Sequence, residues 1–134
     1  MSDNLELARQ WIAKAQNDLL NADNNLKAEQ IPFDTVCFHC QQAVEKFLKA
    51  YLVSNEQIPS HTHDLLLLLE RVLPFNPEAE NLRETLSLLM PYAVEIRYPD
   101  DWFLPSAEDA HEAREAADNV LQWLHTVLPE LRRL

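Results

Sequence analysis

Two histidines precede a predicted helix at a position where they could contact an anion. His61 and His63 flank Thr62 in the stretch HTHDL, and a run of five leucines begins at Leu65. The first turn of a helix has unpaired N–H groups and a dipole that favours negative charge, so neighbouring imidazoles can help to bind phosphate. Alternatively, Thr62 or His63 caps this helix while His61 packs beneath the loop. The sequence leaves both interpretations open.

Two cysteines form a C-x-x-C motif near the start of another predicted helix. Cys37 and Cys40 could exchange electrons there, because a helix N-terminus stabilises a thiolate. No strand precedes them, as would be typical of a redox fold, and both lie on an apolar stripe, so we expect buried core thiols. With His61 and His63 they also offer ligands for zinc, but the spacing is awkward for a zinc site. We therefore expect no metal ion and no cofactor.

A segment rich in proline and aromatic residues, PYAVEIRYPDDWFLP, spans residues 91–105. Its aromatic side chains could form a stacking platform for a nucleic-acid base. We favour the alternative, in which they cover one end of the fold or contact a second subunit. The aromatic residues concerned are Tyr92, Tyr98, Trp102 and Phe103.

The composition limits the classes of protein to which this chain can belong. Its 134 residues include no glycine, which excludes glycine-rich phosphate loops and dinucleotide-binding fingerprints. A net charge of −11 disfavours broad adhesion to nucleic acid or anionic lipid. The N-terminal sequence has no signal-peptide pattern and no apolar run is long enough to span a membrane, so we expect a cytoplasmic protein.

Helical periodicity predicts the elements that position these residues. Apolar residues recur every three or four positions over 4–29, which is typical of a long amphipathic helix. Further helices are expected over 35–54, 64–72, 77–90 and 107–128. Together they predict a single all-α domain over 1–134, an up-and-down bundle of four main helices plus a short inserted helix.

The expected helix over 35–54 has an inward apolar set and a second, polar side. The inward residues are Val36, Cys37, Cys40, Ala43, Val44, Phe47, Leu48, Tyr51 and Leu52. The polar side holds His39, Gln42, Lys46 and Lys49. In the last helix the inward residues are Ala110, Ala113, Ala117, Val120, Leu124 and Val127.

Side chains that cap helices are expected at three further places. Asp34 is placed to cap the helix over 35–54, and Asn76 precedes a proline at the start of the next-to-last helix. Ser106 and Asp109 have the spacing of a capping box before the last helix.

Three segments together resemble the HEPN domain, the higher eukaryote and prokaryote nucleotide-binding family. They are FHCQQAVEKFLKAYL (38–52), HTHDL (61–65) and RYP (97–99), in the family's order. The similarity extends over nearly the whole chain, and it implies a bundle of four or five helices.

The resemblance implies two different functions. Many HEPN domains are similar to metal-independent ribonucleases that present an arginine and a histidine with four to six residues between them. Here the corresponding positions after Arg97 hold Trp102, Phe103 and Leu104, so the ribonuclease motif is absent. Other members act with a minimal nucleotidyltransferase as its partner or substrate-binding subunit.

We therefore expect a homodimeric partner subunit of a nucleotidyltransferase-type protein, with possible nucleotide binding and no catalysis of its own. In that setting Arg97 is the candidate for binding phosphate, because its guanidinium forms bidentate hydrogen bonds. His61 and His63 would be additional donors and Tyr98 a wall of the site. The alternative is a divergent HEPN ribonuclease toxin of a toxin–antitoxin pair, which would use Arg97 with His61 or His63.

Overall fold

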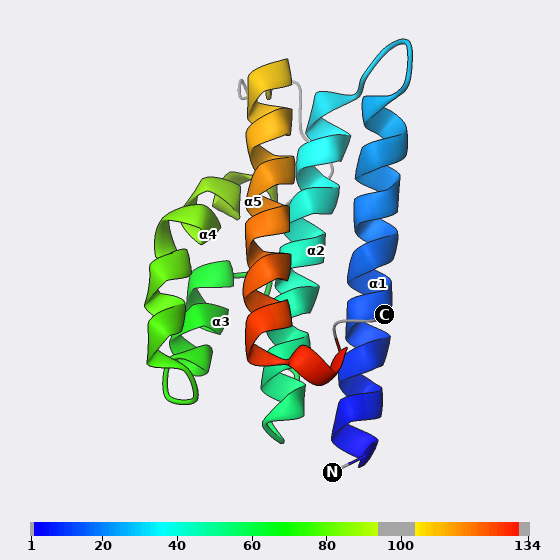
Figure 1. The fold of residues 1–134 in the computed structure, drawn as a ribbon. Coiled ribbons are helices and arrows are strands. Elements are labelled where there is room, and N and C mark those ends of the chain that lie inside the picture. The colour runs from blue at the N-terminus through cyan, green and yellow to red at the C-terminus, as the bar shows by residue number, and fades with distance from the viewer. Residues whose placement is uncertain (1, 94–103, 132–134) are drawn as a thin grey trace.

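The protein folds as a bundle of helices. The computed structural model describes residues 2–93 and 104–131, and every regular element within these ranges is helical (Figure 1). The predicted all-α fold is therefore confirmed. In this part of the chain, no helix is both long enough and apolar enough to cross a membrane.

Three long helices and two short ones make up the bundle. The long helices are α1 (Ser2–Leu26), α2 (Phe33–Ser54) and α5 (Ala107–Val127). The short helices, α3 (Leu65–Val72) and α4 (Arg83–Leu89), lie side by side at one flank (Figure 1). Short 3-10 segments complete the fold: η1 (Pro77–Leu82), η2 (Met90–Tyr92) and η3 (Pro129–Leu131).

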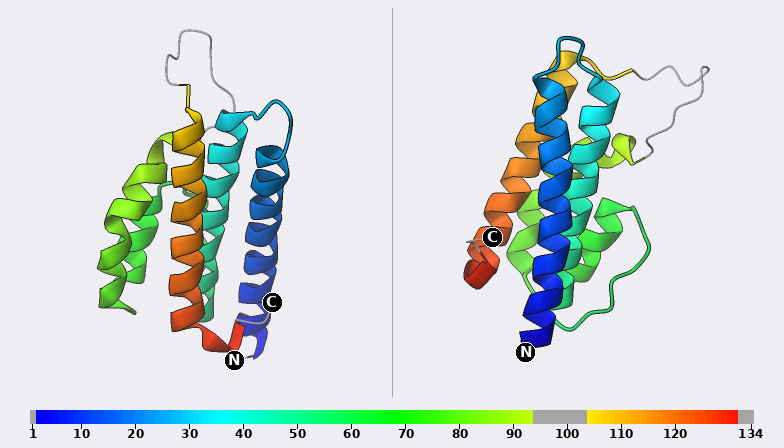
Figure 2. Two further views of the ribbon diagram at one scale, coloured as in Figure 1. Left: turned by 45° about the horizontal axis from the view of Figure 1, so that its top comes forward. Right: turned by 90° about the vertical axis from the view of Figure 1, so that its right-hand side faces the viewer.

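Helix α2 occupies the centre of the bundle. It packs against α1, α5 and α3, with α1 running antiparallel to it (Figure 2). The predicted inward set of α2 is buried throughout. On α1 the buried apolar residues recur every three or four positions, as expected: Ala8, Ile12, Ala15, Leu19 and Ala22. The alanines allow the helix backbones to approach closely, which fixes the packing of α1 on α2.

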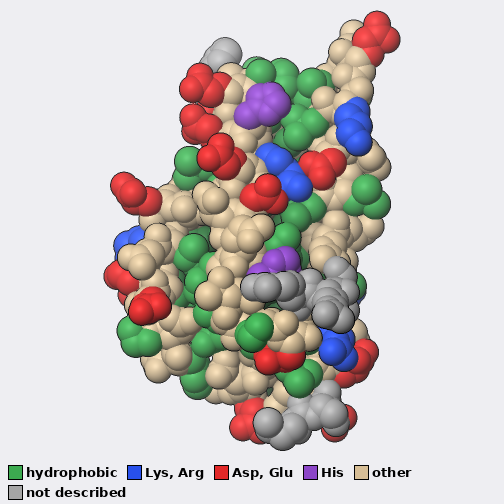
Figure 3. Space-filling model, in the orientation of Figure 1, with side chains coloured by type: hydrophobic (Ala, Val, Ile, Leu, Met, Phe, Trp, Pro, Cys, Tyr) green, Lys and Arg blue, Asp and Glu red, His purple; other side chains and the backbone are tan. Residues whose placement is uncertain are grey.

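The small residues predicted to face inward on α5 are also buried. Ala110, Ala113, Ala117, Val120 and Leu124 belong to the core, while Val127 is only partly buried. A charged contact links α5 directly to α1: Arg114 donates two hydrogen bonds to Asp23, at 2.7 and 3.2 Å, and one to Asp118, at 2.9 Å. On the face shown in Figure 3, acidic side chains gather along the upper part of the molecule, where α5 begins.

The capping box predicted before α5 is confirmed. The Ser106 N–H donates to the Asp109 carboxylate at 2.9 Å, and the Asp109 N–H donates to the Ser106 hydroxyl at 3.1 Å. These two bonds satisfy backbone donors that the first helical turn leaves free.

Two of the other predicted caps are wrong, and the third residue occupies its predicted position without a side-chain bond. Helix α3 is capped by Asp64, whose carboxylate accepts the N–H groups of Leu66 and Leu67, and not by Thr62 or His63. Aspartate has the shorter reach to these donors because it directly precedes the helix. Helix α2 already begins at Phe33, so Asp34 lies inside the first turn, where its carboxylate accepts the N–H of Thr35. Asn76 is the N-cap residue of η1 and Pro77 follows it in the first turn, as predicted, but the Asn76 side chain forms no capping bond.

The helix expected over 77–90 is divided into two segments. Pro77 lies at the start of the 3-10 segment η1, and α4 follows directly at Arg83. The apolar period continues across the junction, so both segments bury one face against the rest of the bundle. The buried residues are Ala79, Leu82, Leu86 and Leu89.

Both cysteines belong to the core, as predicted. Cys37 and Cys40 have no exposed surface, and neither forms a disulfide bond. Burial raises the pKa of the Cys40 thiol to about 12, because desolvation disfavours the thiolate. Burial also raises the pKa of the nearby Tyr92 hydroxyl above its usual value. This environment keeps Cys40 protonated and unreactive.

We therefore predict that native protein at pH 8 does not react with a thiol reagent such as Ellman's reagent, whereas urea-unfolded protein releases the colour of two thiols. Because the pKa of the Cys40 thiol is raised to about 12, its thiolate fraction is negligible at pH 8. Rapid labelling of folded protein would contradict the prediction.

Helix α2 ends in a C-terminal capping motif that contains an unusual residue, Glu56. The N–H of Glu56 donates to the carbonyl of Val53, and the N–H of Gln57 donates to the carbonyl of Leu52, both at 3.0 Å. This is the Schellman arrangement, which places Glu56 at a left-handed φ of 64°. Glycine is the usual residue at this position, because a Cβ atom is strained there.

Replacing Glu56 by glycine should therefore stabilise the fold. We expect Glu56→Gly to raise the free energy of unfolding by about 0.5–1 kcal/mol, since relief of the left-handed strain exceeds the entropy gained by the unfolded chain. Urea denaturation measures the change. Glu56→Ala is the matched control, because it removes the carboxylate but keeps the Cβ atom. Equal stability of the two variants would contradict the strain argument.

Candidate functional site

A polar stripe runs along the buried centre of α2. Gln41, Glu45 and Lys49 are spaced by four residues, so they lie on one face of the helix. All three are buried, with exposed fractions of 0%, 3% and 4%. Charged residues are rarely buried unless they are paired. The partners of this stripe are therefore the first place to look for a functional site.

Glu45 holds two partners at once. Its Oε2 atom accepts a hydrogen bond from Lys49 Nζ at 2.8 Å, and its Oε1 atom lies 2.9 Å from His63 Nδ1. The Lys49 ammonium also lies 5.6 Å from the centre of the Trp11 ring, which is a cation–π contact with α1. The buried Glu45–Lys49 pair, which lies on α2, is thus contacted by α1 through Trp11 and by the connection before α3 through His63.

Gln41 fixes the backbone of the same connection. Its Nε2 atom donates to the carbonyl of His63 at 3.2 Å, and its own Oε1 accepts from Gln42 at 2.7 Å. His63 is therefore held twice, through its backbone by Gln41 and through its ring by Glu45. The connection over 55–64, which runs beside α2 in Figure 2, is anchored to the central helix at this point.

The Glu45 contact determines the orientation of the imidazole. A carboxylate at Nδ1 favours the tautomer with a proton on Nδ1, which leaves Nε2 able to accept a proton. The His63 side chain is 64% exposed, while Glu45 beneath it is almost fully buried. An imidazole held by a buried carboxylate and open to solvent is an arrangement suited to general acid–base chemistry.

A second carboxylate repeats this pattern between α1 and α2. Asp18 Oδ1 lies 2.9 Å from His39 Nδ1, and Asp18 Oδ2 accepts from Lys46 Nζ at 2.5 Å. The His39 ring packs edge-on against Phe38, at 5.4 Å between ring centres. His39 is only 19% exposed, so this group links the two helices and offers less access to a ligand than His63 does.

The structure places the predicted site residues in different environments. His63 joins the Glu45 network, and His61 is exposed nearby. The free N–H groups of α3 that could attract an anion are engaged by Asp64. Arg97 and Tyr98 lie outside the described residues, as do Trp102 and Phe103. Phosphate binding by Arg97, His61, His63 and Tyr98 stays a prediction.

Sequence reasoning missed the two residues that organise this site. Gln41 and Glu45 were absent from both predicted sides of α2, and Lys49 was expected on the polar side although it is buried. The four-residue spacing of glutamine, glutamate and lysine was the available signal. Among the residues with described positions, no group of three or more histidine, cysteine, aspartate or glutamate side chains could hold a metal ion.

Removing one partner of the buried pair should be far more harmful than removing both. We predict that Lys49→Met lowers the free energy of unfolding by about 3–5 kcal/mol, because the buried carboxylate of Glu45 loses its ammonium partner and keeps only the His63 contact. The double variant Glu45→Met with Lys49→Met should recover much of this loss, and Lys14→Met on the exposed face of α1 should change little. Urea denaturation measures all three, and a double variant no more stable than Lys49→Met would refute the pairing argument.

Comparison with known proteins identifies the family. The family model of the HEPN domain matches residues 8–127. The chain is also similar to "Putative toxin MJ1304" of Methanocaldococcus jannaschii: it is 31% identical over an alignment of 142 positions, which covers 95% of this chain and 91% of the relative. No solved structure gives a significant match. The resemblance of the three sequence segments is thus confirmed, and the chain belongs to the HEPN domain family.

Proposed function

We propose that this protein is the toxin-type HEPN component of a two-protein system whose partner is a nucleotidyltransferase-type protein. The observation that carries the proposal is the similarity, over nearly the full chain, to a relative named as a putative toxin. Membership of the HEPN family supports the nucleotidyltransferase partner, as the resemblance of the sequence implies. A homodimer is the expected state of the subunit.

The chemistry that fits the site is cleavage of RNA without a metal ion. His63 Nε2 accepts the proton of a ribose 2′-hydroxyl, and the 2′-oxygen bonds to the adjacent phosphorus. The bond from phosphorus to the 5′-oxygen breaks, and that oxygen takes a proton from the imidazolium or from water. Glu45 stabilises the imidazolium through Nδ1, as the 2.9 Å contact supports. Arg97 and His61 are the predicted phosphate-binding residues, with Tyr98 beside them.

A second candidate function is a binding subunit without catalysis. It is favoured by the absence of a histidine separated from Arg97 by four to six residues, where many family members carry one. The net charge of −11 also disfavours an extended RNA-binding surface, so any ligand would be small, such as a nucleotide. In this case His63 would only position the connection before α3.

A growth assay tests the toxin proposal. Induced expression in a bacterial host without the partner should arrest growth, and co-expression of a nucleotidyltransferase encoded beside the native gene should restore it. His63→Gln should abolish the arrest, whereas His111→Gln, at an exposed position on α5, should leave it intact. Normal growth with soluble wild-type protein would favour the second candidate.

An RNA assay separates catalysis from binding. We predict that purified protein cleaves single-stranded RNA in the presence of EDTA and leaves 2′,3′-cyclic phosphate ends. Loss of the general base typically lowers a reaction rate by about 10²–10⁴-fold, so the His63→Gln variant should cleave RNA more slowly by that factor. Arg97→Ala should also reduce cleavage. An equal rate for His63→Gln and wild type would exclude His63 as the base, and co-purification of a nucleotidyltransferase without cleavage would support the binding subunit.

A further inference from the structure

The buried ammonium of Lys49 shares a carboxylate with the proposed base, His63. Lys49 Nζ donates to Glu45 Oε2 at 2.8 Å, and His63 Nδ1 lies 2.9 Å from Glu45 Oε1. The ammonium and the imidazole are thus held on the two oxygens of one buried carboxyl group. The proposed RNA chemistry assigns roles to His63 and Glu45, but it leaves this ammonium without one.

The packing around Lys49 keeps its charge at this carboxylate. The side chain is almost fully buried, and the ring of Trp11 on α1 lies 5.6 Å from the ammonium. Salt therefore screens the interaction between Lys49 and Glu45 much less than it screens an ion pair at the surface. The positive charge is a fixed part of the surroundings of Glu45.

The charge of Glu45 by itself would favour the wrong form of His63 for a base. A carboxylate beside an imidazole favours the protonated ring, because opposite charges attract. An imidazolium has no free lone pair on nitrogen, so it cannot accept the proton of a 2′-hydroxyl. The Lys49 ammonium offsets the charge of the carboxylate, while Oε1 can still accept a hydrogen bond from Nδ1. Glu45 can thus orient the ring without keeping it charged.

The other charged groups described near the imidazole are exposed to solvent. At the start of α3, Asp64 accepts two backbone N–H groups, and His61 lies on the connection before it. Further along α3, Glu70 and Arg71 are exposed. Helix α1 contributes the uncharged ring of Trp11. Because solvent weakens the effect of exposed charges, the buried pair has the strongest electrostatic influence on the ring among these groups.

We propose that Lys49 is a positioning residue of the site: through Glu45 it keeps the resting imidazole of His63 neutral, with its proton on Nδ1, so that Nε2 can accept a proton. Lys49 acts on His63 and does not contact the substrate. Its importance for RNA cleavage rests on the proposed function, whereas the charge of the ring can be measured without RNA. The imidazolium formed during cleavage is still stabilised by Glu45, but it is not the resting form.

NMR of the wild-type protein provides the first test. In full-length protein labelled with 15N-histidine, the shifts of the ring nitrogens identify the charge and tautomer of each imidazole, and His63→Gln assigns the His63 signals. At pH 7.5 we expect the neutral form of His63 with its proton on Nδ1. An imidazolium at this pH would overturn the proposal.

Titration of variants tests the role of the Lys49 charge directly. Lys49→Met leaves the charge of Glu45 unopposed, so the midpoint of the His63 titration should move to higher pH by about one unit, which is a tenfold higher affinity for the proton. Lys49→Arg keeps a positive charge and should titrate like wild type. An unchanged midpoint in folded Lys49→Met would contradict the proposal.

A double variant keeps the test decisive if Lys49→Met does not fold. Glu45→Gln combined with Lys49→Met leaves neither charge of the pair, and the amide oxygen can still accept from Nδ1. If Lys49 offsets Glu45 in the native protein, His63 should titrate close to the wild-type pH. A midpoint about one unit below wild type would mean that the carboxylate charge is not offset, and the proposal would fail.

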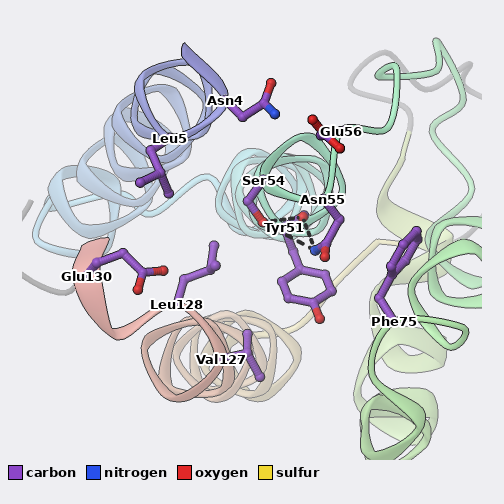
Figure 4. Close-up of a pocket in the computed structure, with 10 residues that line it drawn as sticks. All are labelled: Asn4, Leu5, Tyr51, Ser54, Asn55, Glu56, Phe75, Val127, Leu128 and Glu130. Atoms are coloured by element: carbon purple, nitrogen blue, oxygen red, sulfur yellow. Dashed lines mark hydrogen bonds between the residues drawn. The ribbon is translucent and has the colours of Figure 1, made fainter. Parts of the chain in front are cut away.

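Lys46→Met is the matched control for the loss of a lysine. Lys46 also lies on α2 and donates to a carboxylate that contacts an imidazole, but these partners are Asp18 and His39. Glu130→Gln controls for the loss of an acidic charge; it lies in a cavity of about 700 Å³ that the ends of α1, α2 and α5 enclose and that His63 does not line (Figure 4). His63 should titrate as in wild type in both controls. A shift in Lys46→Met as large as in Lys49→Met would refute a specific role for Lys49.

The pH dependence of RNA cleavage connects the ring to the proposed function. The acid limb of the pH–rate profile should move to higher pH in Lys49→Met, in step with the NMR midpoint. A loss of folded protein alone would lower the rate and leave the limb in place. A limb that stays in place while the NMR midpoint moves would exclude His63 as the base. If the titrations agree with the expectation and no RNA is cleaved, the effect of Lys49 on the ring is supported and the proposed cleavage fails.

Discussion

The buried ion pair between Glu45 and Lys49 is the interaction on which the arrangement of this bundle depends. It lies on the central helix, which α1, α3 and α5 all contact. Burying two charges is unfavourable unless each is fully partnered, so the pair is stable only when its neighbours are in place. Trp11 covers the ammonium from α1, and His63 takes the second carboxylate oxygen. The pair therefore selects one position for α1 and one for the connection that leads to α3.

The need to pair the buried Glu45 carboxylate also explains why His63, on an irregular connection, has one orientation. The connection over 55–64 has no regular structure, and an exposed histidine on such a segment normally samples several rotamers. Glu45 and Gln41 bind the ring and the backbone of His63 from a rigid helix. Any chemistry at Nε2 then starts from one orientation of the imidazole, and the energy that orients it comes from satisfying a buried carboxylate.

The helices and their buried faces could be predicted from the sequence, because a helix that buries one face has apolar residues at every third or fourth position. Ala8 to Ala22 on α1 and Ala110 to Leu124 on α5 follow that period and are buried as expected. Caps were predicted less well, because the residue that accepts the free N–H groups depends on where a helix begins to within one position, as Asp64 shows. The polar network could not be derived from the period, since Glu45 and Lys49 are buried through pairing and apolar patterning assigns such residues to the surface.

The chain as a whole is strongly acidic, but its charges are paired differently at different places in the bundle. Near His63 the buried carboxylate of Glu45 is paired with Lys49, and the exposed carboxylate of Asp64 is engaged as the cap of α3. At the far end, Glu56 and Glu130 have no cationic partner among the described side chains, and they border aromatic walls. Because surface charges are screened within about 10 Å at ordinary salt concentrations, each site responds to its own neighbours more than to the net charge of −11. Local pairing, more than the net charge of the chain, therefore sets the charge that an approaching group meets at each place.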